Sequence, residues 1–416
     1  MRSSPRAARA AGEQCAAGRA AGPRHRLRPV KVGIVVPFSW SFWGAVTEHA
    51  ELQAAALGRL GVETRTIIGN DPPGSFTRVL HPRLGRHDLP PPDVIPVGRT
   101  VIVPANGSLA NIVLSPSSPQ KIRRALERER FDVLHVHEPM APSVCVAAMA
   151  HASCPVVATW HAAGPLRWNR GAVHFWGFLM DRVDYRIAVS EQARLSVERS
   201  FPGPFEVIPN GALIPPRADP RDREHRVVFA GRHDPRKGLP ALVSAWPEIH
   251  RRTGARLRVA GADPLAVRLL LARRRVPEGS VDVLGLLSQE ELSDELLSAK
   301  ALVAPSLGME SFGMVLARAF GCALPVVASD IPGYCDVVTA ETGVLVPPGD
   351  PDALADAVVG LLEDEPGRCA MGASARLAAE ERYSWNAIAE RLLDIYGLVT
   401  GRQRSRVPEL REAITA

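Results

Sequence analysis

Short apolar runs rich in β-branched residues alternate with amphipathic segments along most of the chain. In the first half, apolar runs cover residues 31–38, 62–69, 131–138, 155–161 and 184–190, and helical periodicity covers residues 48–60, 120–130 and 142–151. Strand-length and helix-length segments that alternate at this spacing predict βαβ units built around a parallel sheet.

The same rhythm restarts after a proline-containing segment at residues 201–205. Apolar runs recur at residues 205–211, 226–232, 255–261, 280–287, 300–306 and 325–330, with helices expected from residues 239 and 312. We therefore expect an α/β fold with two doubly wound, Rossmann-like domains, residues 30–203 and 204–384, that face each other across a cleft. Residues 385–416 are expected to form a helix that crosses back to the first domain, followed by a tail. Ligands of such sheets bind outside the carboxyl ends of the strands.

The net charge of +6 arises at the amino terminus. Residues 1–29 contain seven arginines and one acid, Glu13, so the remaining chain is formally neutral. The basic pI therefore does not indicate a nucleic-acid-binding fold, and we expect no nucleic-acid partner. Residues 1–29 are expected to be a disordered Arg/Ala-rich leader, and they lack the apolar core of a secretory signal.

The six cysteines are scattered without a C-x-x-C pair, and most lie within apolar stretches. This usage is typical of reduced, buried thiols and indicates a cytoplasmic protein. The most apolar stretch, residues 143–160, is interrupted by His151 and Pro155 and falls short of a membrane span. Any contact with a membrane is therefore expected to be peripheral.

Two segments far apart in the sequence carry groups that suit a diphosphate. Arg232 and Lys237 follow the apolar run 226–231, where a strand should end and a helix begin. Glu310 precedes residues 311–313, which open the helix expected from residue 312. Cations and the free N–H groups of a helix start both stabilise phosphate. Because a leaving diphosphate gains charge as its bond breaks, the pattern predicts transfer of a group from an activated donor.

These motifs resemble those of retaining glycosyltransferases of the GT-B fold, family 4 type. The resemblance rests on the Arg232/Lys237 pair, on P-S-x-G-x-E-S-F-G at residues 305–313 and on I-P-N-G at residues 208–211, and it covers residues 31–400. Segments 104–110, 131–143, 156–161 and 186–190 further resemble the bacterial GDP-mannose-dependent phosphatidyl-myo-inositol mannosyltransferases. The resemblance implies a hexosyltransferase, with mannose moved from GDP-mannose to an inositol lipid or a related acceptor.

The resemblance also implies a role for each matching position. Arg232 and Lys237 would bind the diphosphate, Glu310 would face the sugar hydroxyls, and His161 would contact the donor sugar near the reacting carbon. The donor site would further include Gly44, Gly231, Gly285, Ser311, Phe312, Gly313, Met314, Val315 and Arg318. The acceptor would contact Thr47, Asn106, Ser108 and His137.

Four positions depart from the family pattern. Arg318 stands where members carry a second glutamate for the nucleotide ribose, and an arginine cannot accept hydroxyl hydrogen bonds. Ala45 replaces the second glycine of a Gly-Gly loop, Thr47 replaces a glutamine, and Asn111 replaces an arginine. Two alternatives therefore stay open: a hexosyltransferase that uses a UDP-sugar on another acceptor, and a catalytically weak sugar-nucleotide-binding protein. A nucleotide-sugar epimerase on the same architecture is a third.

Two patterns formally spell metal ligands. His135 and His137 lie on one strand face beside Glu138, but no third ligand follows at a standard spacing, so we interpret them as a packed strand end. Asp350 and Asp352 form a D-x-D motif that opens a helix, which favours an N-cap. We expect neither a metal nor another cofactor, because the cations already face the diphosphate.

The segment 120–130 is basic and amphipathic. Lys121, Arg123 and Arg124 alternate with apolar positions, which suits either peripheral contact with anionic lipid at the inner face of the plasma membrane or a solvated outer helix. The aromatic residues that follow the first apolar run look exposed in the sequence and favour the lipid interpretation: Phe38, Trp40, Phe42 and Trp43.

Overall fold

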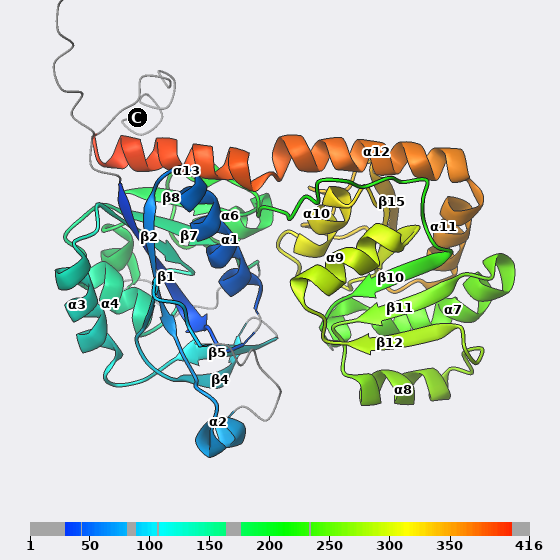
Figure 1. Cartoon of the computed structure of the whole chain (residues 1–416), viewed down its shortest axis with the longest axis horizontal. Coiled ribbons are helices and arrows are strands. Elements are labelled where there is room, and N and C mark those ends of the chain that lie inside the picture. The colour runs from blue at the N-terminus through cyan, green and yellow to red at the C-terminus, as the bar shows by residue number, and fades with distance from the viewer. Residues whose placement is uncertain are drawn as a thin grey trace, which may run out of the picture.

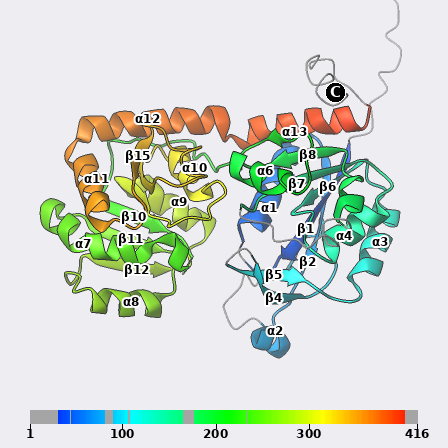
Figure 2. The same cartoon turned by 180° about the vertical axis from the view of Figure 1, so that it is seen from behind.

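The computed structural model describes residues 30–42, 44–80, 89–105, 108–163, 176–232 and 234–401. Two units, each built on a parallel sheet with helices on both faces, stand side by side, and two long helices run along one side of both (Figures 1 and 2). Among these residues no helix is long and apolar enough to span a bilayer.

The first unit contains a seven-stranded sheet in the order β3-β2-β1-β6-β7-β8-β9. Its strands are β1 (Lys31–Ser39), β2 (Glu63–Gly69), β3 (Val94–Pro96), β6 (Val133–His137), β7 (Val156–Trp160), β8 (Tyr185–Ala188) and β9 (Glu206–Val207). Its helices are α1 (Ala45–Arg59), α2 (Ser75–Leu80), α3 (Ser118–Glu129), α4 (Val144–His151) and α6 (Glu191–Glu198). An antiparallel pair, β4 (Thr100–Ala105) and β5 (Ser108–Val113), forms a separate two-stranded sheet.

The second unit contains a six-stranded sheet in the order β12-β11-β10-β13-β14-β15. Its strands are β10 (Arg226–Ala230), β11 (Arg256–Ala260), β12 (Val281–Gly285), β13 (Ala301–Ala304), β14 (Val326–Ser329) and β15 (Gly343–Val346). Its helices are α7 (Leu239–Thr253), α8 (Pro264–Arg273), α9 (Gln289–Ser298), α10 (Met314–Gly321) and α11 (Pro351–Glu363), and a 3₁₀ turn covers Pro235–Lys237.

Each sheet reverses its strand order beside its first strand. The chain proceeds outward from β1 to β2 and β3, then returns to place β6 on the other side of β1; β10 separates β11 from β13 in the same way. Crevices at the carboxyl ends of strands that flank such a switch point are the usual ligand sites of doubly wound sheets. The loops after β1 and β10 are therefore the first places to look for a site.

The last two helices connect the units. Helix α12 (Glu365–Arg382) lies along the second unit, and α13 (Trp385–Val399) lies along the first (Figure 1). Apolar side chains on one face of α13 are buried in the same core as residues of β1 and α1, including Trp385, Leu392 and Ile395. The burial of each such side chain contributes about 1.5–3 kcal/mol, so α13 is part of the first unit.

Two details of the expected organisation differ from the structure. Strand β9 pairs with β8 and closes the first sheet, so the chain leaves the first unit after Val207 and not at residue 203. Trp40 is 6% exposed and packs in the core with β1 and α1, because the chain turns back over the sheet directly after Ser39. Its expected exposure is wrong. Trp43 lies outside the described residues.

The D-x-D motif is an N-cap. The side chain of Asp350 accepts hydrogen bonds from the backbone N–H groups of Asp352 and Ala353, each at 3.0 Å, at the start of α11. Among the described cysteines, Cys145 and Cys322 are buried free thiols, whereas Cys335 is exposed.

Candidate active site

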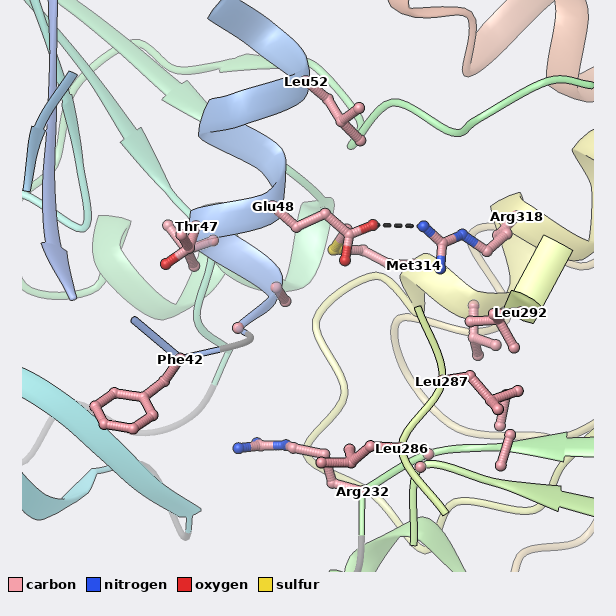
Figure 3. Close-up of a pocket in the computed structure, with 18 of the residues that line it drawn as sticks. Phe42, Thr47, Glu48, Leu52, Arg232, Leu286, Leu287, Leu292, Met314 and Arg318 are labelled. Atoms are coloured by element: carbon pink, nitrogen blue, oxygen red, sulfur yellow. Dashed lines mark hydrogen bonds and ion pairs between the residues drawn. The ribbon is translucent and has the colours of Figure 1, made fainter. Parts of the chain in front are cut away.

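A pocket of about 490 Å³ lies between the two units (Figure 3). The first unit lines it with the loop after β1 and the first turns of α1, and the second unit lines it with the ends of β10 and β11, the segment before α9 and the start of α10. Its volume is in the range of small-molecule sites, about 300–1,000 Å³. Its position at both switch points follows directly from the topology.

An ion pair between two loops of the second unit forms one end of this site. Lys237 Nζ lies 2.7 Å from Glu310 Oε1, with the two side chains 26% and 14% exposed. The close approach depends on Gly238, whose φ is +69° and where a Cβ would lie 1.7 Å from the carbonyl oxygen of Pro305. Any larger residue would separate the loops and with them the cation from the carboxylate.

The helix that follows Glu310 begins at Met314, two residues later than expected. Gly313 is its N-cap, with φ +78°, and a Cβ there would lie 2.5 Å from the ring of Tyr334. Phe312 is 5% exposed and packs in the core of the second unit, while Ser311 Oγ lies 3.0 Å from Ser190 Oγ of the first unit. The free backbone N–H groups therefore belong to the turn after Gly313, where they suit an anion.

The structure brings most of the expected donor positions to this pocket. Its lining includes Gly44, Gly231, Arg232, Lys237, Met314, Val315 and Arg318, but not Ser311, Phe312 or Gly313; Thr47, expected at the acceptor, also lines it. Gly285 is not part of the lining; its carbonyl oxygen accepts a 2.6 Å hydrogen bond from the Gly261 N–H, and Leu286 and Leu287 line the pocket instead. Glu310 contacts the pocket through its ion pair with Lys237.

The acceptor positions are only partly described. Thr47 is buried, and no described residue bonds to its Oγ1. Asn106 lies outside the described residues, and only the backbone of Ser108, at the start of β5, is described. Phe38 and Phe42, expected to meet lipid, line the pocket at the end of β1, together with Asn111.

His161 and His137 belong to a group of histidines at the carboxyl ends of β6 and β7. His137 Nδ1 lies 2.9 Å from His161 Nε2, and the His49 ring packs against both rings. Burial lowers the pKa of His49 to about 4 and holds the pKa values of His137 and His161 well below the usual range. These imidazoles are therefore neutral at pH 7. In the His137–His161 contact, one ring must donate the hydrogen bond and the other accept it.

The same three histidines are the group that comes nearest to a metal site in the described part of the chain. Their candidate ligand nitrogens lie within 4.8 Å of one another. Zinc–nitrogen bonds of 2.0–2.1 Å would place the nitrogens roughly 3.3 Å apart, so the rings would have to draw together to hold an ion. His49 was not identified from the sequence. The absence of a metal stays a prediction.

The Glu138 side chain accepts a hydrogen bond from the backbone of His161. It is half-buried, its Oε1 accepts a 3.0 Å hydrogen bond from the His161 backbone N–H, and desolvation raises its pKa to about 7. Its φ of +50° is rare for a non-glycine residue and is typical of positions fixed by a functional loop. The carboxyl group thus fixes the backbone that carries His161.

Arg318 has a partner that the sequence did not reveal. Its Nη2 lies 2.6 Å from Oε1 of Glu48, on α1 of the opposite unit (Figure 3). It also donates a hydrogen bond to Gln289. The sequence analysis did not identify Glu48 and His49, because it assigned roles in this segment only to the positions that match the family motif, residues 44, 45 and 47. Their position in the first turns of the helix after the first strand was the available signal.

Two family models match the chain. Residues 46–212 match the model described as Glycosyltransferase Family 4, and residues 224–364 match the model described as Glycosyl transferases group 1. The phosphatidyl-myo-inositol mannosyltransferase of Mycolicibacterium smegmatis is 31% identical over 392 residues, which cover 89% of this chain and 95% of that protein. The protein of the same name from Mycobacterium tuberculosis is 34% identical, with 89% and 98% of the two chains covered.

Solved structures with the same architecture are more distant in sequence. Sucrose-phosphate synthase from Thermosynechococcus elongatus superposes with a TM-score of 0.69 at 21% identity, over 90% of this chain and 100% of that one. The pneumococcal O-GlcNAc transferase GtfA, solved with UDP and GlcNAc, superposes with a TM-score of 0.68 at 14% identity, over 90% and 99%. These likenesses confirm the fold expected from the sequence.

Proposed function

The chain belongs to the group 1, family 4 glycosyltransferases, and on that premise we propose that it transfers a mannosyl group from GDP-mannose to a phosphatidylinositol-type acceptor with retention of configuration. Relatives at 31–34% identity that carry this activity in their names support the sugar and the acceptor class. The observation that carries the proposal is the convergence of Lys237, Arg232 and the start of α10 on one interdomain pocket.

The cations act on the leaving group. As the bond between the anomeric carbon and the diphosphate oxygen breaks, negative charge accumulates on the diphosphate. Lys237 and Arg232 stabilise that charge together with the backbone N–H groups at Met314 and beyond. In the structure without ligand, Lys237 is paired with Glu310. When the donor binds, its phosphate contacts Lys237 and its sugar hydroxyls contact Glu310.

Since no side chain is an obvious nucleophile, retention requires that the acceptor hydroxyl attacks from the face that the diphosphate leaves. The new bond joins the acceptor oxygen to the anomeric carbon, and the departing phosphate oxygen takes the acceptor proton. His161 and Glu310 position the sugar in this scheme and form no bond to it. The buried neutral imidazole of His161 suits hydrogen bonding to a sugar hydroxyl, and His137 orients it.

The acceptor class also fits a surface of the first unit. Lys121, Arg123 and Arg124 are exposed on α3, while Ile122 and Leu126 on its other face are buried. We place peripheral contact with anionic lipid on this helix, at the cytoplasmic face of the membrane. Arg123 contacts Glu127 at 3.6 Å. This acid offsets one of the three cations, so the net charge of the face remains positive.

The proposal is tested by supplying the purified full chain with GDP-mannose and phosphatidylinositol in mixed micelles. We expect release of GDP and formation of a mannosylated lipid, with the donor's anomeric configuration kept in the product. Lys237→Ala should lower kcat by roughly 10²–10³, equivalent to about 2.7–4 kcal/mol of barrier, as for loss of other charge-stabilising groups. Mass spectrometry of the lipid and NMR of its anomeric proton are the measurements.

Lys300→Ala is the matched control. Lys300 precedes β13, at the end of the sheet opposite to the pocket, so its removal should leave kcat unchanged. Turnover of UDP-glucose in place of GDP-mannose would contradict the proposal that GDP-mannose is the donor. Binding of GDP-mannose without product, with product formed by Arg318→Glu, would support a sugar-nucleotide-binding protein instead. An unchanged rate in Lys237→Ala would place the diphosphate elsewhere.

A further inference from the structure

Glu48 and Arg318 meet across the pocket from different units. Glu48 comes from the first turn of α1, Arg318 from the second turn of α10, and the contact of 2.6 Å joins Oε1 to Nη2. The side chains are 19% and 11% exposed, so both charges are largely removed from water. A largely buried charge is costly unless an opposite charge lies beside it, and each of these two charges compensates the other. Because both side chains line the pocket, a bound ligand can contact them.

The Glu48 carboxylate still has acceptor capacity. Carboxylate oxygens together offer about four lone-pair sites, and the hydrogen bond from Arg318 uses one of them. No described residue donates to Oε2, which Figure 3 shows turned away from Arg318. An arginine has donors only. The pair therefore presents hydrogen-bond acceptors to the pocket through Glu48 and none through Arg318.

The pocket changes character along its length. One end carries the cations Arg232 and Lys237. Arg318 lies four residues beyond Met314 on α10, about 6 Å along the helix axis from its start. Apolar side chains line the same stretch: Leu286, Leu287 and Leu292. A cationic end, a hydroxyl-accepting side and an apolar wall match, in turn, the diphosphate, the vicinal hydroxyls and the planar base of a nucleoside diphosphate.

We propose that Glu48 accepts hydrogen bonds from the vicinal ribose hydroxyls of the donor nucleotide and that Arg318 is the positioning residue that orients its carboxylate. The inference rests on the proposed function, since it requires a nucleotide donor. It places the ribose contact on the first unit and the diphosphate contacts on the second. The donor therefore bridges the two units, and its affinity depends on the arrangement in which Glu48 and Arg318 meet.

The test compares GDP with 2′,3′-dideoxy-GDP by titration calorimetry on the full chain. Wild type should bind GDP more tightly by on the order of 10–100-fold, as expected for hydrogen bonds to a charged group. Glu48→Ala should lose GDP affinity by the same factor and keep its affinity for the dideoxy nucleotide. Arg318→Met should lose part of the preference. Glu248→Ala, which removes an exposed partner of Arg251 on α7, should keep it.

Three outcomes overturn the inference. In the first, wild type binds both nucleotides equally. In the second, Glu48→Ala lowers both affinities by the same factor, which would make the pair a purely structural link between units. In the third, Glu48→Ala retains the full preference. These results leave the proposed function intact, whereas a wild-type chain that binds neither GDP nor UDP contradicts both. The same comparison with UDP and 2′,3′-dideoxy-UDP applies if UDP is the bound nucleotide.

Discussion

Buried neutral histidines make the stability of this protein depend on pH. Burial lowers the pKa of His49 to about 4 and that of His135 to about 3, and it lowers those of His137 and His161 as well. Below the ordinary value of 6.5 the unfolded chain takes up protons that the folded chain excludes. The histidine contribution is therefore complete above pH 6.5 and is lost as the pH falls towards 4.

We expect the free energy of unfolding to fall by about 1 kcal/mol per histidine for each pH unit within that window. Glu138 acts in the opposite sense: because its folded pKa is raised to about 7, the folded state binds its proton first and gains stability as the pH falls through that value. One carboxyl offsets about one histidine, so the net effect is a loss of stability in acid.

Urea unfolding at pH 7 and pH 5 measures this dependence. His49→Gln should flatten the pH dependence relative to wild type, because one excluded proton is removed from the balance. His151→Gln, an exposed position on α4, should retain the wild-type slope. Equal slopes in wild type and His49→Gln would contradict the assignment of the effect to this cluster.

Helix α13 is attached to the first unit by a buried polar contact as well as by its apolar face. The Tyr396 hydroxyl lies 2.6 Å from His135 Nδ1 and accepts a 3.2 Å hydrogen bond from Gln53 Nε2. His135 Nε2 in turn lies 2.6 Å from Thr159 Oγ1 on β7. The network connects the last helix to β7, the strand that directly precedes His161.

Tyr396→Phe should lower the free energy of unfolding by about 0.5–1.5 kcal/mol, since it removes the hydrogen bonds of the hydroxyl, while His135 Nδ1 and Gln53 Nε2, 3.0 Å apart, keep each other as partners. Tyr383→Phe is the matched control on the adjoining segment. Tyr383 is also buried, but no described residue bonds to its hydroxyl, so its removal should be neutral or slightly stabilising. Thermal unfolding of both variants is the measurement, and equal losses would contradict the interpretation.

Polar contacts beside the pocket join the two units, in addition to an apolar cluster that contains residues of both. The Glu48–Arg318 pair and the 3.0 Å contact between Ser190 and Ser311 both join the first unit to the second. The Glu48–Arg318 ion pair joins α1 to α10, and a substitution that changes the charge of either residue removes its attraction. Its removal should shift the molecule towards more open arrangements.

Small-angle X-ray scattering tests this expectation. Glu48→Arg sets two guanidinium groups against each other and should increase the radius of gyration of the free protein. The swapped double variant, Glu48→Arg with Arg318→Glu, should restore it, with a coupling energy of roughly 0.5–3 kcal/mol in a double-mutant cycle. A double variant as open as the single one would show that the pair does not hold the units together.

The alternation of apolar runs was sufficient to predict two parallel α/β units, because strands buried on both faces read as continuous apolar segments. The antiparallel β4–β5 pair was not predicted, since its residues were considered only for the family motif they carry. Strand β9 was assigned to the wrong unit, because a two-residue edge strand carries too little pattern to show which sheet it joins. Asp350 was predicted correctly because an N-cap is a local signal.

What the chain alone fixed are the local features: the order of strands and helices, the capping groups, and the cations and glycines that follow β10 and β13. Each of these depends on neighbours within a few residues. The tertiary structure decided which distant groups meet. Lys237 reaches Glu310 because Gly238 lets two loops approach, and Glu48 reaches Arg318 because two units face each other. Such pairings depend on how the sheets pack, which no local pattern of residues encodes.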